Sequence, residues 1–183
     1  GSVGLPIGQT RVRIVDEQGN DCPPGEPGVI YVRQPAVPDF TYLNNDQARA
    51  KAGLGDLATV GDIGYLDEEG YLFICDRKSD MVISGGVNIY PAEIEHQLIS
   101  LTGVADCAVF GVPDREYGES LMAVVATVDP SLTEERVKDF IRQRMASYKT
   151  PRQVHFVASL PRDDNGKVAK RKLRDAYSAP QAG

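Results

Sequence analysis

The chain has 183 residues, of which 42% are hydrophobic and 25% charged, and its formal net charge is −6. These values are those of an ordinary globular protein with a core, since a chain of this length buries roughly 70% of the surface that it exposes when unfolded. The negative charge argues against a general nucleic-acid binder, whose affinity depends on neutralising phosphates. No apolar run approaches the ~20 residues of a membrane-spanning helix.

The cysteines and histidines are few and scattered. Cys22, Cys75 and Cys107 lie far apart and form no C-x-x-C pair. This spacing argues against a disulfide scaffold and favours a reducing, cytoplasmic location. His96 and His155 are the only histidines, and neither has a set of ligand residues near it in the sequence, so we expect no metal site in this chain.

The first third of the chain has the pattern of β-strands. Arg11–Val15 alternates polar and apolar residues, and Gly28–Arg33 is rich in β-branched and aromatic residues. A turn-forming stretch, EQGNDCPPGEPG, separates them. A short helical turn is predicted over residues 47–52, and two apolar runs around the acidic loop Asp67–Gly70 predict a hairpin.

Helices and strands mix in the rest of the chain. Apolar residues recur at roughly helical spacing over Pro91–Leu101, and Pro91 suits a first helical turn. The stretch Ser131-Leu132-Thr133-Glu134 fits a capping box that opens another helix. Further predictions are strands at Cys107–Val112, Leu121–Val128 and Gln153–Ala158 and a short basic helix at Lys170–Tyr177.

This order of elements predicts a mixed α+β and α/β chain made of two units. A small β unit ends near Cys75, and an α/β unit follows it. The segment Asp76–Asp80 between them is short, polar and charged. It is a candidate hinge, because a few residues at the end of an element can absorb a large backbone change.

Asp62 and Arg77 are candidate ligands of a sugar or phosphate. Asp62 stands between Gly61 and Gly64, whose missing side chains let a ligand approach, and its two oxygens can accept both hydroxyls of a vicinal diol such as ribose. Arg77, at the end of the following strand, can reach the same ribose or a phosphate with its planar guanidinium. Taken alone, Asp62 fits a tight turn capped by aspartate better, and Arg77 fits a surface ion-pair cluster better.

Two adjacent glycines, Gly85 and Gly86, follow the apolar run Met81–Ile83. Glycines after a strand indicate either a left-handed backbone or the close approach of a ligand. A plain hairpin turn fits these residues as well.

Lys167 is the strongest single candidate for a catalytic residue. It follows the turn formed by Asn165 and Gly166, where its long side chain can project from the body of the protein. A mobile ammonium suits the stabilisation of charge on a transferring phosphoryl group. Four further basic residues lie between positions 170 and 174, so a solvated basic tail is the alternative. An RNA-binding tail fits less well, because no aromatic residues interleave with these charges.

Three long motifs, taken in order, resemble the adenylate-forming superfamily, which includes acyl-CoA synthetases, the adenylation domains of peptide synthetases and firefly luciferase. TVGDIGYLDEEGYLFICDRKSD is similar to the ribose-binding segment and hinge of that family, and MVISGGVNIYPAEIE to the loop and helix that follow. YKTPRQVHFVASLPRDDNGKVAKRKLR is similar to the terminal motif with the catalytic lysine. The segment ISGGVNIYPAEIE is most similar to the corresponding segment of acyl-CoA synthetases of fatty, aromatic or related acids.

The resemblance covers essentially the whole chain and implies an organisation. Residues 1–76 would be the last β subdomain of a large N-terminal domain. Residues 77–80 would be the hinge, centred on Ser79, and residues 81–183 a mobile α/β C-terminal domain. The family usually has Asp or Lys at the position of Ser79, although a small residue is physically acceptable in a hinge.

The resemblance also implies an activity, that of an ATP-dependent, AMP-forming carboxylic acid–CoA ligase. Such an enzyme uses Mg-ATP to convert an acid to an acyl-adenylate and then transfers the acyl group to the thiol of coenzyme A. Asp62 would hold the ribose hydroxyls, Arg77 would contact the ribose or phosphates, and Lys167 would bridge the carboxylate and the α-phosphate. After a domain rotation, Gly85 and Gly86 would line the tunnel for pantetheine.

The resemblance further implies that this chain is a C-terminal fragment. The segment GSVGLPIG resembles the one just downstream of the family's magnesium-binding glutamate, and the phosphate loop and acyl pocket are absent from the sequence. We therefore expect the fragment alone to be inactive and to need the N-terminal lobe of the same protein. Two alternatives stay open: an adenylation domain that loads a carrier protein, and a non-catalytic binding or regulatory module.

Overall fold

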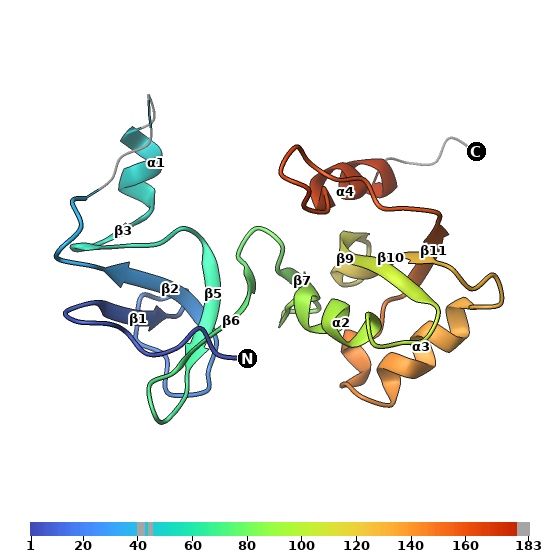
Figure 1. Ribbon diagram of the computed structural model, residues 1–183, viewed down its shortest axis with the longest axis horizontal. Coiled ribbons are helices and arrows are strands. Elements are labelled where there is room, and N and C mark those ends of the chain that lie inside the picture. The colour runs from blue at the N-terminus through green and yellow to red at the C-terminus, as the bar shows by residue number, and fades with distance from the viewer. Residues whose placement is uncertain (40–42, 44–45, 179–183) are drawn as a thin grey trace. The chain divides into compact units, whose positions relative to one another are not determined.

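The computed structural model describes residues 1–39, 43 and 46–178 and divides into two compact units, Gly1–Ser79 and Asp80–Gly183 (Figure 1). The elements of the first unit are β1 (Arg11–Val15), β2 (Gly28–Arg33), α1 (Asp46–Lys51), β3 (Gly53–Leu54), β4 (Leu57–Ala58), β5 (Asp62–Leu66) and β6 (Leu72–Arg77). Those of the second are β7 (Val82–Ser84), β8 (Val87–Ile89), α2 (Pro91–Leu98), β9 (Val104–Asp114), β10 (Gly118–Thr127), α3 (Glu134–Arg142), the short 3₁₀ helix η1 (Ser147–Lys149), β11 (Gln153–Val157) and α4 (Lys170–Ser178).

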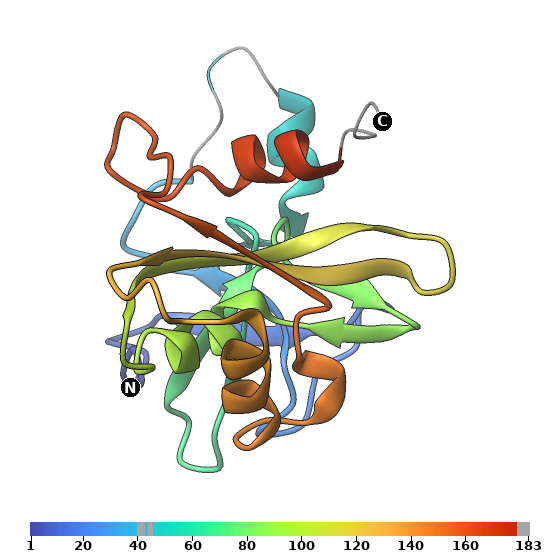
Figure 2. The ribbon, with the colours of Figure 1, turned by 90° about the vertical axis from the view of Figure 1, so that its right-hand side faces the viewer.

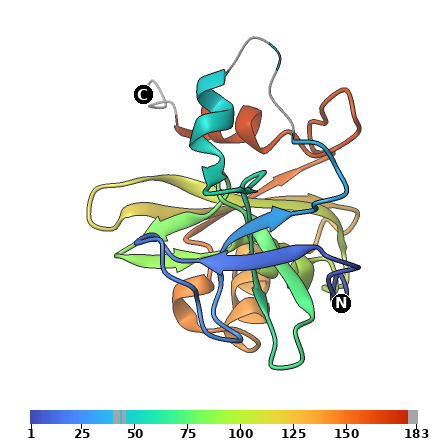
Figure 3. The ribbon, with the colours of Figure 1, turned by 90° about the vertical axis from the view of Figure 1, so that its left-hand side faces the viewer.

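The first unit is an antiparallel sheet with the strand order β3-β4-β2-β5-β6, and β1 pairs with β2 (Figure 3). The predicted strands β1 and β2 are confirmed with their predicted bounds. The predicted hairpin is also confirmed, because β5 and β6 pair antiparallel and Leu66 lies opposite Leu72. The Asp67 carboxylate accepts from the backbone N–H groups of Glu69 and Tyr71, which fixes the acidic turn.

The second unit is built around β10, which pairs antiparallel with β9 and parallel with β11. Helices α2 and α3 cover one face of this sheet and α4 covers the other (Figure 2). Successive residues of a strand point to opposite faces, so alternate residues of β9 and β10 enter two separate apolar clusters. Val109 and Val125 pack under α2 and α3, whereas Phe110 and Val124 pack with α4.

Two helix boundaries differ from the prediction. Helix α2 ends at Leu98 rather than Leu101. Helix α3 has Thr133 as its N-cap, and the Thr133 hydroxyl accepts from the Arg136 N–H at 3.3 Å. The capping box predicted to start at Ser131 is therefore wrong by two residues. The Ser131 hydroxyl donates instead to the Asp129 carboxylate at 2.6 Å.

Helix α2 buries Cys107 of β9, whose S–H points to the Glu95 carbonyl oxygen at 3.6 Å. Burial, with smaller contributions from the Glu95 and Asp106 charges, raises the pKa of the Cys107 thiol to about 12.

In a Cys22→Ser, Cys75→Ser variant, we expect Cys107 to react with a disulfide reagent at pH 8 at least about a hundredfold more slowly in buffer than in denaturant. Equal rates would contradict the packing of α2 on β9.

Within the described residues, no helix has the length and apolar character needed to cross a membrane.

Candidate functional site

The structure brings Asp62 and Arg77 together. They are the first residue of β5 and the last of β6, and the antiparallel register places them directly opposite each other. Arg77 Nε lies 3.5 Å from Asp62 Oδ1. The Asp62 side chain is 25% exposed and that of Arg77 is 62% exposed, so both groups remain open to a ligand. Such a pair offers a carboxylate for hydroxyl groups and a guanidinium for hydroxyl or phosphate oxygens.

The two glycines that flank Asp62 have different roles. Gly61 has a positive φ of 87° with nothing near a would-be side chain, so it provides the turn into β5. Gly64 is buried, and a Cβ there would overlap the Phe73 carbonyl oxygen and lie 2.9 Å from Ile30 Cδ1. The prediction that Gly64 opens space for a ligand is therefore wrong, because that space is already filled by the sheet.

Gly64→Ala should consequently destabilise the first unit, at the upper end of the about 1–3 kcal/mol that overpacking costs. Chemical denaturation of the chain, followed by circular dichroism, measures this loss. Gly61→Asn is the matched control, because asparagine tolerates a positive φ and meets open space there. Equal stability of the two variants would contradict the close approach of β5 and β6 at Gly64.

Ser79 is exposed within the turn 78–80 and is the last residue of the first unit. Its backbone neighbour Lys78 donates its N–H to the Gly61 carbonyl at 2.7 Å, so a backbone hydrogen bond ties the residue before Ser79 to the start of β5. The hinge function of residues 77–80 stays a prediction.

Gly85 and Gly86 form the tip of the β7–β8 hairpin, with φ values of 57° and 80°. Two successive positive φ values suit a two-residue hairpin turn, which explains both glycines without a ligand. Gly85 also donates its N–H to the Tyr117 carbonyl at 3.0 Å. In addition, it lines a pocket.

This pocket lies within the second unit and has a volume of about 580 Å³. Its lining combines residues from the β7–β8 hairpin, the β9–β10 turn, β10, α3, η1 and the segment between η1 and β11. They include Gly85, Tyr117, Lys138, Arg142, Tyr148 and Arg152. Apart from Gly85, sequence reasoning missed all of these. Lys138 and Arg142, one helical turn apart on α3, were a detectable signal of a basic helix face.

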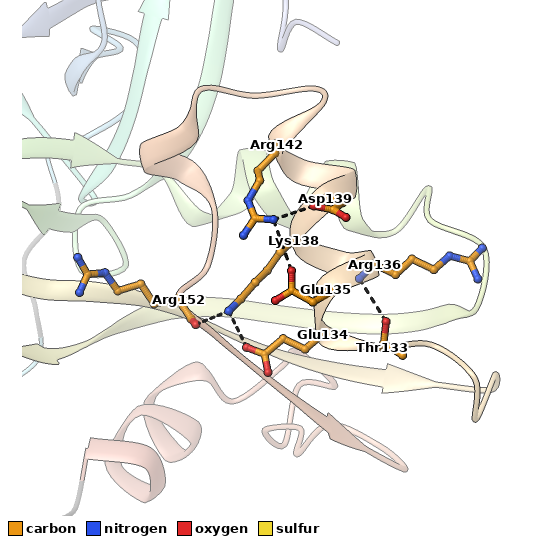
Figure 4. A network of polar contacts seen from close by, with 8 residues as sticks. All are labelled: Thr133, Glu134, Glu135, Arg136, Lys138, Asp139, Arg142 and Arg152. Carbon is orange, nitrogen blue, oxygen red and sulfur yellow. Dashed lines mark hydrogen bonds and ion pairs between the residues drawn. The ribbon is translucent and has the colours of Figure 1, made fainter.

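The cations of the pocket are held by carboxylates and by one carbonyl (Figure 4). Lys138 Nζ lies 2.7 Å from Glu134 Oε1 and donates to the Arg152 carbonyl at 2.7 Å. The hydrogen bond from Lys138 lowers the pKa of Glu134. Arg142 is 47% exposed and pairs with Asp139 at 2.7 Å and with Glu135 at 3.6 Å. Because exposed pairs of this kind are weak, Arg142 can exchange these carboxylates for a phosphate at little cost.

Arg152 stacks on an aromatic ring at the pocket. Its guanidinium carbon lies 4.3 Å from the centre of the Tyr117 ring, and its Nη1 is 3.2 Å from Asp114 Oδ2. Asp114 also accepts from the backbone N–H groups of Tyr117 and Glu116, and these hydrogen bonds lower its pKa. The β9–β10 turn is therefore ordered, and it fixes the ring of Tyr117 and, through it, the guanidinium.

Lys167 lies at the exit of a tight hairpin, as its sequence context predicts. The Asp163 carboxylate accepts from the N–H groups of Asn165 and Lys167, each at 2.9 Å, and the Asp163 N–H donates to the Lys167 carbonyl at 2.8 Å. Gly166 completes the turn with a φ of 78°. The Lys167 side chain is exposed, and among the described residues its ammonium forms no ion pair. An ordered hairpin, rather than a loose basic tail, therefore presents this lysine.

Asp62 and Arg77 belong to the first unit, and Gly85, Gly86 and Lys167 to the second. In the part of the chain that the structure describes, no cluster of three His, Cys, Asp or Glu side chains is placed to hold a metal ion.

Comparison with known proteins gives a consistent result. The family model described as AMP-binding enzyme C-terminal domain matches residues 93–167. A long-chain-fatty-acid–CoA ligase of Escherichia coli O6:H1 is 42% identical over 175 residues, which are 96% of this chain and 31% of that protein. A 2-succinylbenzoate–CoA ligase of Bacillus licheniformis is 41% identical over 94% of this chain and 36% of its own length.

Solved structures agree with these matches. ATP-bound MatB from Rhodopseudomonas palustris superposes with a TM-score of 0.88 at 35% identity, over 98% of this chain and 36% of that one. The o-succinylbenzoate CoA synthetase MenE from Bacillus subtilis, in complex with its acyl-adenylate intermediate, gives a TM-score of 0.87 at 35% identity, over 100% of this chain and 36% of its own. The chain thus spans about a third of the relatives it matches.

The predicted resemblance and fold class are confirmed: residues 93–167 match the AMP-binding enzyme C-terminal domain, and the chain as a whole is similar to the C-terminal part of acyl-CoA synthetases, which are adenylate-forming enzymes.

Proposed function

We propose that this chain is the C-terminal part of an AMP-forming carboxylic acid–CoA ligase, an enzyme of the cytoplasm. The enzyme activates an acid with ATP to an acyl-adenylate and pyrophosphate and then transfers the acyl group to coenzyme A. The observation that carries the proposal is the ordered hairpin that presents the ammonium of Lys167 without an ion pair among the described residues. A solvated basic tail needs no fixed backbone. A group that stabilises charge on a phosphoryl group must be held in position, and an ordered hairpin can hold it.

The nucleotide is assigned to the first unit. Asp62 would accept hydrogen bonds from the two ribose hydroxyls, and Arg77, held beside it, would contact the ribose or a phosphate. The opposed register of β5 and β6 supports this assignment, because it fixes a carboxylate and a guanidinium side by side on one edge of the sheet. The matched relatives MatB and MenE have been solved with ATP and with an acyl-adenylate, respectively.

Lys167 is assigned to the first half-reaction. A carboxylate oxygen of the acid attacks the α-phosphorus of ATP, and pyrophosphate leaves with its bonding electrons. The ammonium would bridge the carboxylate and the α-phosphate and stabilise the charge that develops between them. The resemblance of GSVGLPIG to the segment just downstream of the family's magnesium-binding glutamate supports assigning the magnesium ligands to the N-terminal lobe.

Coenzyme A is assigned to the pocket beside Gly85. Its phosphates match the basic side chains of Lys138, Arg142 and Arg152, and its adenine matches a pocket that also holds Tyr117 and Tyr148. Gly85 and Gly86 would border the path of pantetheine from this pocket. A carrier protein presents pantetheine without an adenine nucleotide, so the basic pocket favours free coenzyme A as the acceptor.

The test uses the full-length protein with ATP, magnesium and a panel of acids that includes long-chain fatty acids and 2-succinylbenzoate. We expect AMP and acyl-CoA to form in equal amounts with free coenzyme A, and no product from the 183-residue chain alone. Acid-dependent AMP formation without a thioester on free coenzyme A would indicate an adenylation domain for a carrier protein. Failure of every acid to support pyrophosphate exchange would favour a non-catalytic module.

A further inference from the structure

The hairpin that carries Lys167 is attached to the rest of the second unit at both of its ends. At its start, Arg162 Nη2 pairs with Asp106 of β9, while Arg162 Nη1 donates to the Gly166 carbonyl at 2.7 Å. One guanidinium therefore binds both the sheet and the residue just before Lys167. A planar guanidinium is suited to this task, because its N–H groups point in fixed directions.

At the end of the hairpin, Lys170 Nζ lies 2.8 Å from Glu95 Oε1 of α2. The two side chains are only 17% and 19% exposed, so solvent screens this pair less than the surface pairs of the molecule. The same Glu95 oxygen accepts from the Val109 N–H of β9 at 2.7 Å. Glu95 therefore connects three elements: α2, the sheet and the start of α4.

Both attachments lead to the same strand. Asp106 and Val109 lie on β9, which pairs along its length with the central strand β10. The helix that follows the hairpin is fixed as well, since Leu173 and Tyr177 of α4 pack on Phe110. Apolar contacts hold the base of the hairpin as well, because Leu160 and Val168 belong to the same apolar cluster as Phe110. The charged attachments of Arg162 and Lys170, which lie on either side of Lys167 in the chain, add to this packing in fixing the orientation of the hairpin.

Resting on the proposed function, we infer that Glu95 is a positioning residue for Lys167. It acts through Lys170, three residues after Lys167, and sets the direction in which the hairpin leaves the sheet. A displacement of about 1 Å at a group that contacts the reacting atoms can lower a rate by about a hundredfold. Loss of the Glu95–Lys170 pair should therefore slow the half-reaction that uses Lys167 and spare the other.

The test is Glu95→Gln in the full-length protein. Glutamine keeps an oxygen for the Val109 N–H but loses the charge that holds Lys170. We expect adenylation, measured by pyrophosphate exchange, to fall by about tenfold to fiftyfold, and thioester formation from preformed acyl-adenylate to stay within about twofold. Lys170→Met should give the same pattern, and Lys170→Arg should recover most of the rate. Arg171→Met is the matched control. Arg171 is 93% exposed on the same helix, and its ion pair with Asp175 is long, at 4.0 Å.

A double variant separates positioning from general stability. In a Lys167→Ala background, Glu95→Gln should lower adenylation no further, because the group that it positions is gone. An equal loss in both half-reactions, or a further loss in the Lys167→Ala background, would overturn the inference. The proposed function fails differently, namely when Lys167→Ala itself leaves adenylation unchanged.

Discussion

Lys167→Ala in the full-length protein should lower the rate of adenylation by about 10²–10³-fold, the usual effect of removing one group that stabilises developing charge. Thioester formation from preformed acyl-adenylate should stay within about twofold of the unaltered protein. The reason is the role that we propose for Lys167, whose exposed ammonium would stabilise the charge that develops at the α-phosphate. Pyrophosphate exchange measures the first step, and single-turnover transfer to coenzyme A measures the second.

Two further variants make this result specific. Lys172→Ala removes an exposed positive charge from α4, and we expect it to leave both half-reactions unchanged. Lys167→Arg keeps the charge but replaces a compact ammonium with a planar guanidinium, so it should restore only part of the rate. An equal loss of both half-reactions in Lys167→Ala would show that the lysine has a structural role, and an unchanged rate of adenylation would exclude it from the chemistry.

Much of the fold was predictable because its signals are local. Alternation of polar and apolar residues predicted β1, and β-branched and aromatic residues predicted β2, each with its bounds. An acidic, glycine-closed loop predicted the β5–β6 hairpin. The register of that hairpin also brings together two residues that are distant in the sequence, since it places Asp62 opposite Arg77. The turn before Lys167 is local too, formed by Asp163, Asn165 and Gly166.

Other features depend on contacts between distant segments and had no local signal. The pocket joins side chains from several parts of the second unit, and only Gly85 among them was singled out in the sequence. The Glu95–Lys170 pair likewise forms only when α2 and α4 take up their places beside β9. Gly64 was misinterpreted for the same reason, because the atoms that exclude a side chain there belong to Ile30 and Phe73 on neighbouring strands.

Gly85→Val should give the opposite pattern to Lys167→Ala. A Cβ at Gly85 would lie 3.1 Å from Tyr117 Cδ1, and the branched side chain of valine would extend into the pocket that we assign to coenzyme A. We expect thioester formation from preformed acyl-adenylate to fall by about a hundredfold or more, since the thiol can no longer take up its reactive position. Adenylation should stay within about twofold, which also reports that the variant is folded.

The control for backbone strain is Gly19→Val, at a glycine of the first unit with a φ of 89° and no neighbour within 4 Å of a would-be Cβ. It imposes a comparable left-handed strain far from the pocket in the sequence, and both half-reactions should survive it. If Gly85→Val leaves transfer to coenzyme A unchanged, then pantetheine does not pass this hairpin, and the two glycines serve only its turn. If it slows adenylation equally, the hairpin is needed for the fold of the second unit. Selective loss of transfer, set beside the selective loss of adenylation in Lys167→Ala, would assign the two half-reactions to two separate parts of one unit.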